Sequence, residues 1–77
     1  MSCLHAELDR AVQQARATCT ALAALGVEMR SVVHSERDDP GLCAAVLMAH
    51  SQRAALALTT LTGTIGQIEL LARLGAP

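Results

Sequence analysis

The chain has no Phe, Tyr or Trp, and its only cationic side chains apart from histidine are six arginines. Aromatic rings build the surfaces on which bases stack and the cages that hold cationic ligands, so their absence argues against those functions. The net charge is −1, and the arginines are scattered, so no basic stripe is present to bind phosphates or an anionic membrane. We therefore expect no nucleic-acid partner.

The chain has three cysteines, and their spacing does not match that of a disulfide framework or a zinc site. Cys3, Cys19 and Cys43 are odd in number and form no C-x-x-C pair, which argues against a disulfide framework or a zinc site and favours a reducing compartment. No cationic stretch followed by an apolar core marks a signal peptide at the N-terminus. We expect a cytoplasmic protein.

Residues that could carry chemistry are also few. Apart from the cysteines, the candidate bases and ligands are His5, His34 and His50, which share no ligand or triad spacing with them. The neighbouring Asp38 and Asp39 are explained by helix capping. We expect no catalytic residue, no cofactor and no metal, so an enzyme is not predicted.

The length of 77 residues, or 8.0 kDa, allows one domain over residues 1–77. Such a chain buries only about 60% of the surface that it exposes when unfolded. Yet 52% of its residues are hydrophobic and only 17% are charged. This combination predicts a helical domain whose apolar surface is completed by a partner or by self-association.

Apolar residues recur at alternating spacings of four and three in the first half, which is the pattern of a long amphipathic helix over about 3–36. Val12, Cys19 and Val33 lie beside this row, and Gly26 is the position where the helix could bend or break. The first-half row contains Leu4, Leu8, Ala11, Ala15, Thr18, Leu22, Leu25, Met29 and Val32.

A turn is predicted at 37–41, where charged residues precede Pro40 and Gly41. Asp39 is placed to cap a second helix, with Pro40 at its first position. This helix, about 40–74, has the same spacing, and Thr59 to Gly66 is its weakest part because β-branched residues and glycine favour helix poorly. The second-half row contains Leu47, Ser51, Ala54, Leu58, Leu61, Ile65, Ile68 and Ala72. The sequence thus predicts an all-α, antiparallel, coiled-coil-like two-helix hairpin.

The second helix has a further row of small and apolar residues on a neighbouring face. One neighbouring helix cannot cover both rows, so we expect the further row to bind a partner, while Leu47, Leu58, Leu61, Ile65 and Ile68 pack against the first helix. The uncharged stretch from Ala54 to Ile68 is 15 residues, short of the ~20 that a membrane span needs, so no stable span is expected. The partner row contains Leu42, Val46, Ala49, Leu56, Thr60, Gly63, Leu70 and Leu74.

The hairpin architecture resembles small components of bacterial type III secretion systems. The features that carry the resemblance are Leu22-x-x-Leu25, the Asp38-Asp39-Pro40 turn and the stretch Gln52-Arg53-Ala54-Ala55-Leu56-Ala57-Leu58. They are similar to the co-chaperone of the needle subunit. The resemblance implies binding to a larger helical-repeat chaperone and to the needle subunit, which the complex keeps soluble.

Two alternatives stay open. Asp39-Pro40-Gly41-Leu42 and the apolar end Leu70-Leu71-Ala72-Arg73-Leu74 resemble the needle or inner-rod subunit of the same systems. The chain end Gly75-Ala76-Pro77 favours the co-chaperone, because a filament core would be expected to need an extended helical tail. A homodimeric helical bundle with no role in secretion is the other alternative.

Overall fold

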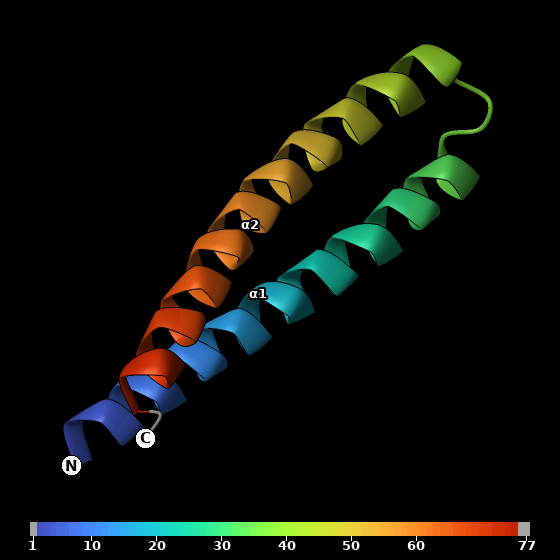
Figure 1. Cartoon of the computed structure of the whole chain (residues 1–77). Coiled ribbons are helices and arrows are strands. Elements are labelled where there is room, and N and C mark those ends of the chain that lie inside the picture. Colours follow the sequence, from blue (N-terminus) through green and yellow to red (C-terminus); the bar gives the residue numbers. More distant parts are fainter. Residues whose placement is uncertain (1, 76–77) are drawn as a thin grey trace.

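Two long helices form the whole of the described chain. The computed structural model describes residues 2–75, in which α1 spans Ser2–Ser35 and α2 spans Pro40–Gly75, and no strand occurs in that range. The helices run antiparallel and are joined by a short turn, with both chain ends at the other end of the molecule (Figure 1). The Cα trace measures 59 × 14 × 14 Å. The prediction of an all-α hairpin is confirmed.

The turn is held by local hydrogen bonds around Asp39. The Glu36 amide still donates to the Val32 carbonyl at 2.9 Å, and the Asp39 amide donates to the Glu36 carbonyl at 3.0 Å. Oδ1 of Asp39 then accepts from the Leu42 amide at 3.0 Å, and Pro40 is the first helical residue. Asp39 is therefore the N-cap, as predicted, because its carboxylate satisfies an amide that has no partner within the helix.

The interior of α1 is the row read from the sequence. Every member of the first-half row from Leu4 to Val32 is buried or half-buried, whereas their neighbours are exposed. Helix α1 continues through Gly26 without a break, and Val12 and Val33, beside the row, are about half exposed. The row itself contains no charged residue, whereas charged residues occur on other faces of α1. This contrast identifies the interior face of α1 from the sequence.

The interior of α2 differs from the prediction at alternate positions. Ser51, Leu58, Ile65 and Ala72 were expected inside and are exposed, Leu58 to 53% and Ile65 to 44%. The prediction was correct for Leu47, Ala54, Leu61 and Ile68, which face α1 at half-buried positions. The interior row of α2 contains Cys43, Leu47, His50, Ala54, Ala57, Leu61, Thr64, Ile68 and Leu71, with Val46 half-buried at its edge.

Size complementarity accompanies this choice of face in part of the interface. Glu28 lies against His50, and Leu4 lies against Gly75, which fixes the register of the two helices. The same register sets Leu22 opposite Ala57, Leu25 opposite Ala54, and Ala11 opposite Ile68. At these three layers a large side chain faces a small one, which lets antiparallel helices interdigitate closely. Leu8 and Leu71, by contrast, are two large side chains in one layer.

The threonine-rich part of α2 is helical throughout. The hydroxyls of Thr59, Thr60, Thr62 and Thr64 each donate to the carbonyl four residues earlier, at 2.9–3.2 Å. These bonds satisfy the hydroxyls inside the helix, so no other partner is needed for them. Gly63 and Gly66 keep helical backbone angles, since no described residue has a positive φ.

Packing is tightest far from the turn. The buried residues of the described chain are Ala11, Thr64 and Leu71, with exposures of 3%, 4% and 8%. All three belong to the half of the hairpin that holds the termini. Interior residues near the turn, such as Val32 and Cys43, are only half-buried.

Candidate protein-interaction site

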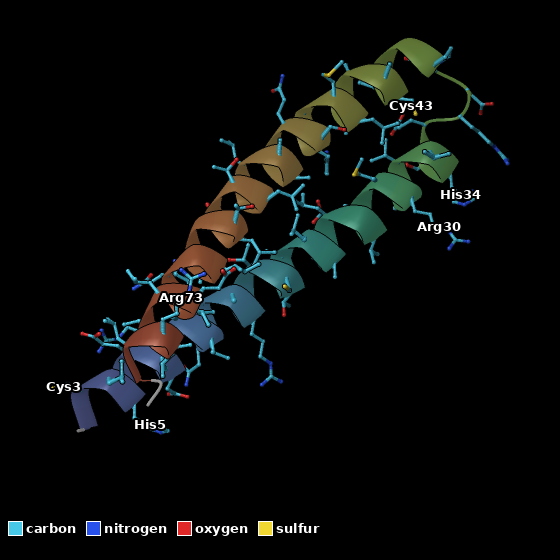
Figure 2. All side chains as sticks on the ribbon, in the orientation of Figure 1. Cys3, His5, Arg30, His34, Cys43 and Arg73 are labelled. Carbon is cyan, nitrogen blue, oxygen red and sulfur yellow. The ribbon has the colours of Figure 1, made fainter. Side chains whose placement is uncertain are left out.

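The histidines and cysteines, which are the side chains that could act in catalysis or bind a metal, are spread along the hairpin. Cys3 and His5 lie at the end that holds the termini, whereas His34 and Cys43 lie near the turn on different helices (Figure 2). Among residues 2–75, no three His, Cys, Asp or Glu side chains gather in a way that could hold a metal ion. Chemistry of that kind therefore has no support in the described arrangement.

One polar pair crosses the interface. His50 Nε2 lies 2.9 Å from Glu28 Oε2, and His50 Nδ1 lies 2.9 Å from the Val46 carbonyl. The imidazole side chain is 14% exposed and the Glu28 side chain 57%. Because both partners are acceptors when Glu28 is ionised, the ring donates to both at once only when both of its nitrogens carry a proton. His50 is the one histidine of the described chain that is not exposed. Its contact with Glu28 joins the two helices and helps to fix their register, which is a structural role.

The partner row lies outside the α1–α2 interface and faces solvent over most of its length. Leu56 is 71% exposed, Leu74 69%, Leu70 58% and Leu42 47%. Its smaller members Ala49, Thr60 and Gly63 are also exposed, and Val46 is half-buried. Single exposed leucines are ordinary, but here four lie along one side of one helix, with Arg53 and Gln67 between them in the same row.

An open groove of about 320 Å³ adjoins the middle of this row. Its walls are mostly small side chains from both helices, with Gln14 as the one longer side chain. Leu56 stands immediately before one lining residue, Ala57. The groove is lined by Gln14, Ala17, Thr18, Ala21, Ala57 and Thr60.

Thr60 belongs to the partner row predicted from the sequence, whereas the α1 side of the groove was not predicted. Ala17 and Ala21 line the groove from α1, and alanine on an amphipathic helix indicates neither core nor site by itself. Their contribution follows only from the register of the two helices, which no pattern within α1 gives.

The exposed area is large for the mass of the chain. The chain exposes 5778 Å², whereas a compact globular protein of this mass exposes about 4,450 Å². The elongated shape, 59 × 14 × 14 Å, accounts for the difference of about 1,300 Å². For comparison, each partner covers ~800 Å² in a standard protein interface.

Helix α2 is, by length and composition alone, long and apolar enough to cross a membrane. A helix at the centre of a soluble helical bundle has the same two properties. Within α2, Arg53, Glu69 and Arg73 carry formal charges, and a buried charge in hydrocarbon is costly. The uncharged stretch from Ala54 to Ile68, which was too short for a membrane span, is only part of this helix.

No protein-family model, curated protein or solved structure matches the chain.

Proposed function

We propose that this chain is a helical protein–protein interaction module, in which the partner row and the adjoining groove bind a helix of another protein. The observation that carries the proposal is the position of Leu56, 71% exposed beside a groove walled mostly by small side chains. A partner helix would insert a large apolar side chain into the groove, while Leu56 inserts between side chains of the partner. Reciprocal insertion of this kind is how helices pack.

The more specific role is the one that the resemblance implies. In this role, the hairpin is a cytoplasmic co-chaperone of a type III secretion needle subunit and acts together with a larger helical-repeat chaperone. In this role, the needle subunit would polymerise through an apolar helical surface if that surface were left uncovered. An uncovered row of leucines is suited to shield such a surface, because burial of apolar area is non-directional and tolerates different partners.

Co-expression tests the proposal. The chain is produced alone, with the helical proteins encoded beside its gene, and with each of them separately, and particle mass is measured by light scattering after size-exclusion chromatography. We expect a soluble complex whose mass includes this chain and at least one helical partner. Polymerisation of the chain alone would instead indicate the filament subunit, and the absence of any complex would contradict the proposal.

Variants locate the interface. Leu56→Asp and Gly63→Leu are expected to weaken partner binding at least tenfold, since each introduces a charge or excess volume into a packed apolar contact. Ala55→Asp is the matched control, because Ala55 is exposed and no member of the partner row lies three or four residues from it along α2. Retention of full partner binding by both Leu56→Asp and Gly63→Leu would refute the assignment of this surface.

A further inference from the structure

A second apolar surface lies on the side of the hairpin opposite the groove. It consists of every seventh residue of each helix, starting at His5 in α1 and at Ala44 in α2. None of these residues is Asp, Glu or Arg, and Asp9, Arg16 and Arg30 border the face along α1. We call this surface the uncharged face; it contains His5, Val12, Cys19, Gly26 and Val33 of α1, and Ala44, Ser51, Leu58, Ile65 and Ala72 of α2.

The large residues of this face are open to solvent. Val12 is 50% exposed, Val33 49%, Leu58 53% and Ile65 44%, and Cys19 is also exposed. Two of them, Leu58 and Ile65, are the ones that sequence analysis had placed inside the hairpin. The interior of the hairpin is complete without them, so another molecule must cover them if they are to be buried.

The spacing along the uncharged face is self-complementary. In α1, Val12 and Gly26 each lie seven residues from Cys19; in α2, Ile65 and Ser51 each lie seven residues from Leu58. Cys19 and Leu58 are near the midpoints of their helices. A two-fold axis near these midpoints sets Val12 opposite Gly26 and Ile65 opposite Ser51 of the second copy. Cys19 and Leu58 then lie opposite their own counterparts, and Val33 lies opposite His5.

We propose that the uncharged face is the interface of a symmetric homodimer, in which α1 packs against α1 and α2 against α2 of a second copy, with the two turns at opposite ends. Within one hairpin, Leu22 faces Ala57 in the same large-to-small way. A two-fold interface requires one surface to complement itself, and the Val12–Gly26 and Ile65–Ser51 pairs give each helix one such match about one axis.

Charge decides the relative direction of the two copies. Glu36, Arg37, Asp38 and Asp39 give each turn a net charge of −2. Turns at the same end would bring these like charges together, whereas turns at opposite ends separate them by the length of the hairpin. The opposed arrangement also lays the tightly packed end of one hairpin over the loosely packed turn end of the other.

The area is sufficient for this assembly. The excess exposure of about 1,300 Å² per chain is enough for one standard interface, which takes ~800 Å² from each partner, and not for two. The uncharged face and the partner row are on opposite sides, so a dimer leaves the partner row free. The homodimer therefore goes beyond the proposed function and does not depend on it.

The first test is particle mass. Analytical ultracentrifugation of the full chain is expected to show a species of twice the 8.0 kDa chain mass. Leu58→Asp should weaken dimerisation at least tenfold with unchanged helix content by circular dichroism, because Leu58 is half exposed in the single hairpin. Leu56→Asp is the matched control and should remain dimeric. A wild-type monomer at 100 µM, or a Leu58→Asp variant as dimeric as the wild type, would overturn the proposal.

The second test is disulfide cross-linking, which needs no disruptive substitution. A variant with Cys3→Ser and Cys43→Ser keeps Cys19 alone, next to the two-fold axis. Diamide, which takes up the two protons and two electrons of a thiol pair, should convert it to a disulfide-linked dimer on a non-reducing gel. A variant that keeps Cys3 alone should not cross-link. Cross-linking through Cys3 but not Cys19 would refute the opposed arrangement.

Discussion

Replacement of Gly66 by alanine is expected to stabilise the protein. Gly66 lies within α2 on its outer side, has helical backbone angles, and has no atom within 4 Å of the position that a Cβ would occupy. Alanine favours a helix interior over glycine by about 0.8–1 kcal/mol, largely because glycine loses more backbone freedom on folding. With no clash to offset it, most of this free energy should appear as added stability.

The expected shift in melting temperature follows from chain length. Unfolding entropy near the midpoint is about 2.1 cal/mol/K per residue, or roughly 160 cal/mol/K for this chain, so 1 kcal/mol corresponds to a shift of about 6 °C. The measurement is thermal unfolding followed by circular dichroism at 222 nm. Wild type and variant are compared at equal chain concentration, because association makes the midpoint concentration-dependent.

Two other glycines sharpen the test. Gly63 is equally free of neighbours, so Gly63→Ala should raise the midpoint of the isolated chain by a similar amount. At Gly75 an added Cβ would lie 2.9 Å from Cδ2 of Leu4, so Gly75→Ala forces that side chain to move and should gain less. A Gly66→Ala variant with an unchanged or lower midpoint would refute the reasoning, because it would mean that α2 is not a continuous helix at this position.

Three further experiments test the packing, the turn and the His50–Glu28 pair. Asp39→Ala should lower the free energy of unfolding by about 1 kcal/mol through loss of the bond to the Leu42 amide, measured by urea unfolding, whereas Asp38→Ala should cost less; equal losses would show that the cap is not specific to Asp39. Leu71→Ala should cost at least about 2 kcal/mol, a large share of the stability of a chain this small, and a melting temperature near that of the wild type would contradict its burial. A double-mutant cycle with His50→Ala and Glu28→Gln should give a coupling of under about 1 kcal/mol, since Glu28 is largely exposed; no coupling at all would mean that the two side chains do not meet in solution.

The predictability of the two helices from sequence differs for a physical reason. In α1, charged and polar residues leave one apolar row, so periodicity alone identified the interior from Leu4 to Val32. In α2, apolar residues occur on every side, and periodicity permits several rows. Sequence periodicity therefore could not choose among them, and in the structure Ala57 and Thr64 are inside while Leu58 and Ile65 are outside. Ala57 fits this interior because it lies opposite the larger Leu22.

The candidate site also has one part that the sequence predicts and one part that it does not. The partner row is a property of one helix, and its exposed leucines could be read from spacing. The groove beside it is a property of two helices in one register, and no pattern within α1 marked Ala17 or Ala21. The uncharged face likewise appeared only when the interior of α2 was known, because Leu58 and Ile65 had been assigned to that interior.

The position of the tightest packing has a consequence for how the chain folds. Ala11, Thr64 and Leu71 are the best-buried residues, and they lie far from the turn that joins the helices. Contacts near the turn close short loops, whereas the contact between the Leu8 and Leu71 layers closes a loop of about sixty residues, which costs more chain entropy. We therefore expect helix pairing to start at the turn, where each contact adds little stability. The pairing becomes stable only when the layers that contain Ala11, Thr64 and Leu71 form. Removal of a few residues from either end should consequently slow folding little and speed unfolding strongly, so that the termini determine the lifetime of the folded hairpin.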